Sequence, residues 1–97
     1  MTITYSIGGK QFASRKDLVK YIHSIFEKYP VRTPLDKNDF DFACDLLRHH
    51  PEANEKIGCG IDTIITDTAA HGTTCFYLQR TDGTKDDFSY LSCIKNY

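Results

Sequence analysis

The first half of the chain has an apolar stripe at helical spacing over residues 15–29. Its members recur every three or four residues and are Leu18, Ile22, Ile25, Phe26 and Tyr29. Lysines and a glutamate occupy the other side, which is the pattern of an amphipathic helix. Ser14 is a good N-cap, with Asp17 three residues later as in a capping box. Pro30 then stops the helix.

A second helix is predicted from about Asp36 or Asn38 to His49. Its apolar stripe consists of Phe40, Ala43, Cys44 and Leu47, widened by Leu46. Aspartates are concentrated in the first turn and basic side chains in the last, an arrangement that favours both ends of the helix dipole. Pro51 disfavours helix in the residue before it.

The second half of the chain has β signals. Residues 57–66 are rich in β-branched side chains, and the pattern of residues 73–93 predicts a hairpin that turns at Asp82-Gly83. A two-residue loop would place Phe76 opposite Ser89. A three-residue loop at positions 81–83 places Phe76 opposite Phe88 and position 74 opposite position 90. The second register collects aromatic rings on one face, and we expect it for that reason.

These elements predict an α+β fold in which two helices pack on one face of an antiparallel β-sheet, within a single domain of residues 1–97. The strand at 57–66 and the final hairpin form the centre of the sheet. A tight hairpin at Gly8-Gly9 lies beside them. The side chains expected in the core are Leu18, Ile22, Ile25, Leu46, Leu47, Phe76 and Phe88.

Composition narrows the class of protein. The chain has 97 residues, 40% of them hydrophobic and 26% charged, which is typical of a globular domain and not of a disordered segment. No apolar run approaches the roughly 20 residues that span a bilayer, so we expect no membrane association. The first residues lack the apolar stretch of a signal peptide, and the expected localisation is cytoplasmic.

The net charge is −1, but its distribution is uneven. Residues 1–35 hold six basic and two acidic side chains, whereas residues 36–97 hold six basic and eleven acidic ones. A basic first third suits contact with nucleic acid or with an acidic protein surface. It also suits a solvated helix face with no partner, and charge alone does not separate these readings.

Four cysteines, Cys44, Cys59, Cys75 and Cys93, are 15 to 18 residues apart. Structural zinc sites need ligands two to four residues apart, so no metal site is predicted. Nothing in the sequence calls for a small-molecule cofactor. We expect these cysteines to be free and to lie in the core as small apolar groups.

The segment GCG at 58–60 resembles the start of a phosphate-binding loop. Such loops lead into a helix N-terminus, but Gly60 leads into β-branched residues and no third glycine follows. Gly58 and Gly60 are therefore expected on one face of a strand, which they leave flat. A flat surface of this kind admits a closely packed helix or serves as a docking site for a protein partner.

No catalytic constellation emerges. Cys44 lies on an apolar stripe, where a thiol is inert despite the nearby histidines. Asp86 and Asp87 point to opposite faces of a strand. General acid–base chemistry at His50 or His71 stays open, because a composite site leaves no sequence motif. We expect a protein that is not an enzyme.

Several motifs together resemble the DCL family, named for defective chloroplasts and leaves. They are LLRHHPEANEKIGCGIDTIIT, CFYLQRTDG and DFSYLSCI, with IGGKQFASRKDLVKYI near the start. The resemblance covers nearly the whole chain and implies a role in RNA metabolism. Plant members are linked to ribosomal RNA maturation in plastids, and a similar domain ends the largest subunit of a plant-specific RNA polymerase. The matching polar positions are His50, Lys56, Arg80, Asp82, Asp87, Ser89 and Tyr90.

The chain departs from the family where Thr74, Leu91 and Ser92 replace typically basic residues, which removes part of any phosphate-binding surface. The predicted nucleic-acid-binding residues are Lys16, Lys20, His50, Lys56, Arg80 and Tyr90, with Tyr77 and Phe12 as further stacking candidates. Arg80 enters a hairpin turn and is expected to be exposed. The predicted partner is RNA or an RNA-containing complex. The alternative is a protein-interaction module, such as a small bacterial or phage regulator or inhibitor of a host protein, which docks at Gly58 and Gly60.

Overall fold

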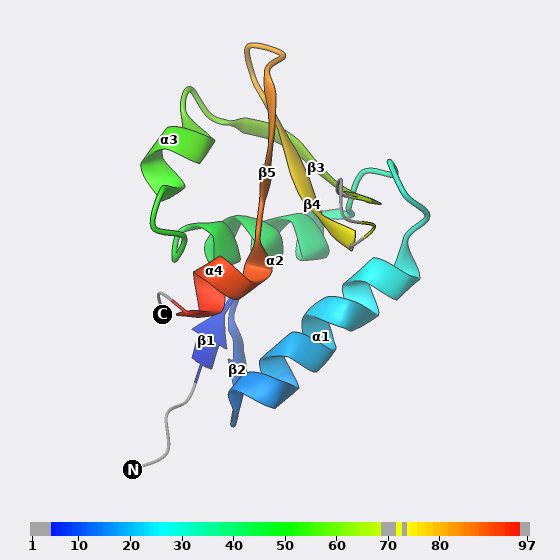
Figure 1. Cartoon of the computed structure of the whole chain (residues 1–97), viewed down its shortest axis with the longest axis vertical. Coiled ribbons are helices and arrows are strands. Elements are labelled where there is room, and N and C mark those ends of the chain that lie inside the picture. Colours follow the sequence, from blue (N-terminus) through cyan, green and yellow to red (C-terminus); the bar gives the residue numbers. More distant parts are fainter. Residues whose placement is uncertain (1–4, 69–71, 73, 96–97) are drawn as a thin grey trace.

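The structure is a computed structural model of the whole chain and describes residues 5–68, 72 and 74–95. Its elements are β1 (Tyr5–Ile7), β2 (Lys10–Phe12), α1 (Arg15–Lys28), α2 (Lys37–Leu47), α3 (Ala53–Ile57), β3 (Ile61–Thr68), β4 (Thr74–Arg80), β5 (Lys85–Phe88) and α4 (Tyr90–Lys95). The strands form a two-stranded and a three-stranded sheet (Figure 1). The predicted α+β class is confirmed.

Both long helices begin at a side-chain cap: α1 at the predicted Ser14, and α2 at Asp36, one of its two predicted starts. The predicted end of the second helix at His49 is two residues too late, because α2 ends at Leu47. The Ser14 hydroxyl accepts a hydrogen bond of 3.2 Å from the main-chain N–H of Asp17, at the start of α1. The Asp36 carboxylate accepts one of 2.9 Å from the N–H of Asp39, at the start of α2. Such caps satisfy N–H groups that have no acceptor within the helix, so local sequence is enough to fix these starts.

The three-stranded sheet is antiparallel in the order β3-β4-β5. Phe76 lies opposite Phe88, and Gly83 has the positive φ of 88° that a three-residue loop needs at its last position. The predicted register is therefore confirmed. The predicted pairing of Thr74 with Tyr90 is wrong, because β5 ends at Phe88 and Tyr90 is the first residue of α4.

The N-terminal hairpin does not join this sheet, contrary to the expectation that it lies beside the central strands. It lies next to α2, away from the three-stranded sheet (Figure 1). The Gly8 N–H donates to Asp45 at 2.6 Å, and a Cβ at Gly8 would lie 3.0 Å from the Cα of Phe42. The outer edge of β3 is already used, because the N–H groups of Arg32 and Leu35 bond to its carbonyls.

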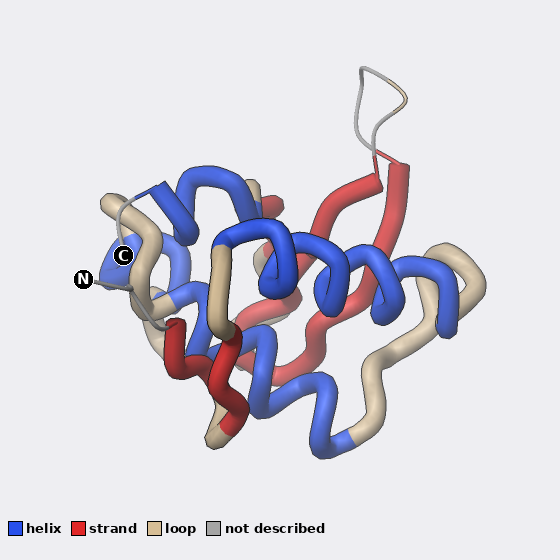
Figure 2. Tube along the Cα trace, turned by 90° about the horizontal axis from the view of Figure 1, so that it is seen from below, coloured by secondary structure: helices blue, strands red, loops and turns tan. Residues whose placement is uncertain are grey.

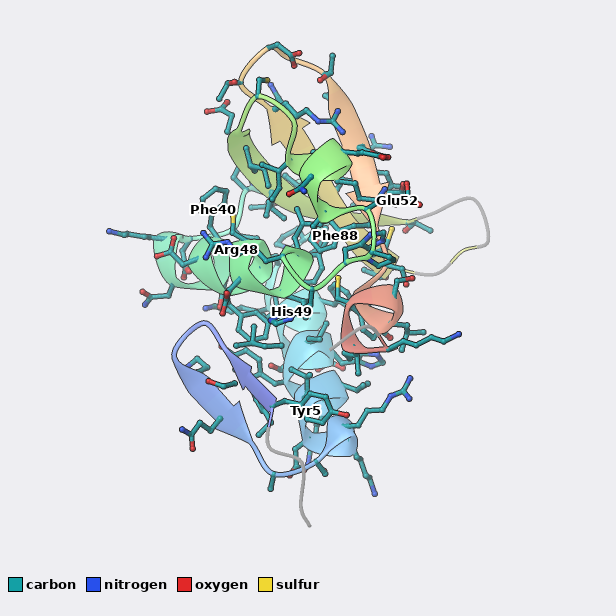
Figure 3. All side chains as sticks on the ribbon, turned by 90° about the vertical axis from the view of Figure 1, so that its left-hand side faces the viewer. Tyr5, Phe40, Arg48, His49, Glu52 and Phe88 are labelled. Atoms are coloured by element: carbon teal, nitrogen blue, oxygen red, sulfur yellow. The ribbon has the colours of Figure 1, made fainter. Side chains whose placement is uncertain are left out.

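One face of the three-stranded sheet is covered by α1 and α2. The strands run behind the longest helix, α1, in Figure 2. The ring centroids of Phe26 in α1 and Phe76 in β4 are 4.9 Å apart. Phe88 points into the middle of the molecule (Figure 3). All seven side chains predicted to be in the core are buried. No helix among the described residues is long and apolar enough to cross a membrane.

Candidate nucleic-acid interface

Two of the predicted phosphate ligands, Lys56 of α3 and Arg80 of β4, converge on one carboxylate. Asp86 of β5 accepts from Lys56 Nζ at 3.3 Å and from Arg80 Nη2 at 3.2 Å. Arg80 Nε also donates to the main-chain oxygen of Lys56 at 2.8 Å, and Lys56 Nζ donates to that of Asp87 at 2.7 Å. Both basic side chains are only 15% exposed. This ionic cluster of Lys56, Arg80 and Asp86 ties α3 to the β4–β5 hairpin.

The expectation that Arg80 is exposed is wrong. Its guanidinium donates hydrogen bonds to Lys56, Thr84 and Asp86. These bonds hold it against α3, so it does not project from the turn. A planar guanidinium with several fixed acceptors is a rigid structural group. Its role, and that of Lys56, in contacting phosphate stays a prediction, and contact would require these bonds to open.

Gly58 and Gly60 lie outside any strand, so the strand predicted to begin at position 57 is wrong in its first residues. Gly58 ends α3 with a φ of 53°, Gly60 has a φ of 123°, and β3 begins at Ile61. A Cβ at Gly58 would lie 3.2 Å from Cδ and Nε of Arg80. The close approach that this glycine permits is thus made by the Arg80 side chain. Docking of a partner at these glycines stays a prediction.

His50 is buried in the turn between α2 and α3. Its Nδ1 accepts a hydrogen bond of 3.0 Å from the main-chain N–H of Glu52, so this nitrogen is unprotonated. Burial, together with the nearby charge of Lys56, lowers the pKa of His50 below its ordinary value. The geometry makes His50 a neutral acceptor that shapes the turn, and its predicted role in nucleic-acid binding is untested.

Lowering the pH should destabilise the fold through His50. The pKa is lower in the folded state, so the unfolded state binds the proton first as the pH falls below about 6.5. Stability contributed by neutral His50 is therefore present above that pH and is lost as the pH falls toward the folded-state pKa. The thermal midpoint of the wild type should drop more between neutral and mildly acidic pH than that of His50→Leu. If the thermal midpoints of the two proteins fall equally with pH, His50 is not a neutral acceptor that stabilises the fold.

Tyr90 begins α4 and is held by α1. Its hydroxyl and His23 Nε2 are hydrogen-bonded at 2.8 Å, and its ring packs edge-on against Phe26 at 5.6 Å between centroids. With Glu27 and Thr74 these side chains line a shallow hollow between α1, β4 and α4. Nearby Leu91 is 46% exposed. Tyr90 is thus part of an aromatic cluster, and one of the departures from the family pattern, Thr74, lines the same hollow.

Lys16 and Lys20 lie exposed on the first turns of α1. Among the described residues neither forms an ion pair, and the same holds for the exposed Arg15 beside them. The basic residues that do form ion pairs are Lys28, Arg32, Arg48, Lys56 and Arg80. The first turns of α1 lie at the opposite end of the molecule from the β4–β5 turn (Figure 1). The predicted ligands therefore do not form one surface.

The face of the three-stranded sheet turned away from α1 and α2 is the surface that the sequence reasoning missed. We call it the outer sheet face, and its residues are Thr63, Ile65 and Asp67 of β3, Cys75, Tyr77 and Gln79 of β4, and Lys85 and Asp87 of β5. Arg32 and Pro34 border a shallow depression on it. Partial burial, with Cys75 and the carboxylate of Asp87 nearby, raises the pKa of Tyr77. The available signal was the period of two along β4, which places Phe76 and Leu78 on one face and Tyr77 and Gln79 on the other.

The cysteines are free, as expected, but their burial differs. Cys93 is buried, and desolvation raises its pKa to about 12. Cys44 is half-buried with a pKa of about 11, again because of desolvation, which favours the inert thiol. Cys59, in the turn after α3, is exposed, and Cys75 is only partly buried on the outer sheet face, so the prediction of a core position is wrong for both. No group of three or more metal-ligating side chains occurs among the described residues, and His71 lies outside them.

Residues 23–94 match a family described as "Protein of unknown function (DUF3223)". The chain belongs to this family. A solution NMR structure of an uncharacterized protein from Rhodospirillum rubrum has the same fold, with a TM-score of 0.88 and 31% sequence identity. That match covers 96% of this chain and 89% of the other.

Two relatives of this family member come from the plant Arabidopsis thaliana. A segment of DNA-directed RNA polymerase V subunit 1 of Arabidopsis thaliana is 38% identical over 72 residues, covering 71% of this chain and 4% of the relative. Protein DCL homolog, chloroplastic, of the same plant is 46% identical over 52 residues, covering 52% of this chain and 24% of the relative. The resemblance to the DCL family is confirmed. The chain spans only a small part of these longer proteins.

Proposed function

We propose that this chain is a non-catalytic binding domain that associates with RNA or an RNA-containing complex. Its relatives include a subunit of an RNA polymerase and a DCL homolog, so the similar domain occurs in proteins connected with RNA. The observation that carries the proposal for this chain is the exposed basic surface on the first turns of α1, formed by Arg15, Lys16 and Lys20.

Unpaired cations are the groups that bind phosphates most readily. A lysine already bonded to a carboxylate gains little from a phosphate, because it must first give up its existing partner. Lys16 and Lys20 pay no such cost, and residues four apart on a helix lie about 6 Å from each other, so both can reach one nucleic-acid backbone. Three contacts at most are available here, which predicts weak binding with a salt slope of about −2 for single-stranded RNA.

The test is a double substitution, Lys16→Ala with Lys20→Ala, measured by fluorescence anisotropy with a labelled single-stranded RNA over a range of salt concentrations. Loss of two phosphate contacts should weaken binding and make the salt slope shallower by about 1.4. The matched control is Lys37→Ala with Lys95→Ala, which removes two exposed lysines from other elements and should leave the slope unchanged.

Two results would contradict the proposal. One is wild-type affinity no tighter than about 10⁻⁴ M at physiological salt, which is ordinary non-specific binding. The other is an equal effect of the control substitutions, which would mean that only overall charge matters. A change in melting temperature of the double variant is not expected, because neither lysine forms an ion pair within the part of the chain that the structure describes.

A protein-interaction module is the second candidate, and the outer sheet face favours it. An antiparallel sheet normally has one solvated face of polar residues, but here Ile65 and Tyr77 lie at its centre. Tyrosine surrounded by a polar rim is typical of protein interfaces. Protein association that survives nuclease treatment and is lost in Tyr77→Ala, but not in Lys16→Ala, would favour this candidate over RNA association.

A further inference from the structure

The outer sheet face has an apolar centre and charges of both signs. Ile65 lies opposite Tyr77, and Tyr77 lies opposite Asp87 in the next strand. One row nearer the β4–β5 turn, Thr63, Gln79 and Lys85 lie side by side. Asp67 lies one row farther away and is paired with Arg32 at 3.0 Å. Lys85 and Asp87 are thus the exposed charges of this face that form no ion pair among the described residues.

These features argue against two kinds of occupant. A polyanion that stacked a base on Tyr77 would bring its phosphates near the unpaired carboxylate of Asp87, and this repulsion would offset the attraction to Lys85, the unpaired cation among the described residues of this face. A small molecule needs a concave site that buries most of its surface, whereas the depression here is shallow and open. A flat, mixed-charge protein surface fits better.

The order of the charges is complementary to itself. Lys85 and Asp87 are two residues apart on β5, so they point to the same face. Consider a two-fold axis in the plane between two such faces, perpendicular to the strands, that passes over β5 midway between Lys85 and Asp87. Rotation about this axis places β5 of the second copy over β5 of the first and reverses the order of the two residues. Lys85 of each copy then faces Asp87 of the other, twice, and Tyr77 packs near Gln79 of the other copy. Isologous interfaces of this kind are the commonest in homo-oligomers.

We propose that the outer sheet face is a homodimer interface, in which the Lys85–Asp87 pairs fix the orientation of two copies stacked sheet to sheet. Aligned sheets pack about 10 Å apart and keep their strands within about 30° of each other, so the pairing of β5 with β5 is retained. This inference is independent of RNA binding, which involves α1 on the covered side of the sheet.

The size of the face sets the expected affinity. Three strands and the bordering segment, at about 4.8 Å spacing, and a length of about 20 Å give about 400 Å² per copy. The total of about 800 Å² is below the 1,200–2,000 Å² of standard stable interfaces. The dimer should therefore be weak, with a dissociation constant of about 10–500 μM.

Charge reversal in solution is the test, with sedimentation equilibrium as the readout at physiological salt. Lys85→Asp alone places two like-charged pairs in the interface and should weaken dimerisation at least tenfold, as should Asp87→Lys alone. The protein that carries both Lys85→Asp and Asp87→Lys restores opposite charges with reversed polarity and should dimerise about as well as the wild type. Lys37→Asp, a reversal at an exposed lysine of α2 on the covered side of the sheet, is the matched control and should leave dimerisation unchanged.

A second readout locates the interface. On dilution of the wild type, amide chemical shifts should change at Thr63, Ile65, Tyr77, Gln79 and Lys85, and should stay constant in α1. A wild type that remains monomeric at about 1 mM would overturn the proposal, since that leaves no affinity of the predicted size. So would a dimer whose shifts lie elsewhere, or a double variant no better than the single ones.

Discussion

Replacing Phe88 with alanine should lower the free energy of unfolding by about 3–5 kcal/mol, the usual range for a buried phenylalanine. Phe88 is 2% exposed and stacks on Phe76 with 5.3 Å between ring centroids and 20° between ring planes. Phe76 in turn contacts Phe26 of α1. The substitution therefore leaves a cavity at the point where the final hairpin meets the longest helix.

Chemical denaturation of the wild type, Phe88→Ala and Phe88→Leu measures this effect. Leucine refills part of the cavity, so it should recover a clear fraction of the loss. Leu91→Ala, three residues away at a side chain that is 46% exposed, should cost less than about 1 kcal/mol. If Phe88→Ala costs as little as that control, the assignment of faces to β4 and β5 is wrong.

The features that sequence predicted correctly are those set by local contacts. Ser14 and Asp36 start their helices because a cap needs only the next three residues. The hairpin register followed from pairing Phe76 with Phe88 across a loop of three residues. The short helices α3 and α4 were missed, because five or six residues are too few to show a helical period. Gly58, which ends α3, was nevertheless a helix-stop signal that could have been used.

The features that sequence did not predict depend on contacts between distant segments. The position of the N-terminal hairpin rests on the bond from Gly8 to Asp45, 37 residues away. The burial of Arg80 rests on the main chain of Lys56 and on Asp86. No single segment reveals that a basic residue will find its acceptors elsewhere in the fold. For the same reason, counting basic residues overstated the predicted phosphate-binding surface, because Lys56 and Arg80 are held in the ionic cluster, whereas Lys16 and Lys20 form no ion pair among the described residues.

The ionic cluster makes Arg80 a structural residue, because its guanidinium joins β4 to α3 and to β5. Arg80→Ala leaves Lys56 and Asp86 imperfectly paired and the main-chain oxygen of Lys56 without its donor. Removing one partner of a buried pair costs about 3–5 kcal/mol, but Asp86 is 35% exposed and water can partly solvate it, so we expect about 2–3 kcal/mol. Arg80→Lys should recover little, because an ammonium does not reproduce the three directed bonds of the guanidinium.

Arg32→Ala is the matched control, since Arg32 is 78% exposed and its ion pair with Asp67 should contribute less than about 1 kcal/mol. A double-mutant cycle of Arg80→Ala and Asp86→Ala, followed by urea denaturation, should give a coupling energy of at least about 1 kcal/mol, because both substitutions remove the same contact. If Arg80→Ala instead costs no more than Arg32→Ala, the guanidinium is not held by α3 and β5. It would then be available to a phosphate, and the RNA-binding surface that we propose would have to include the β4–β5 turn.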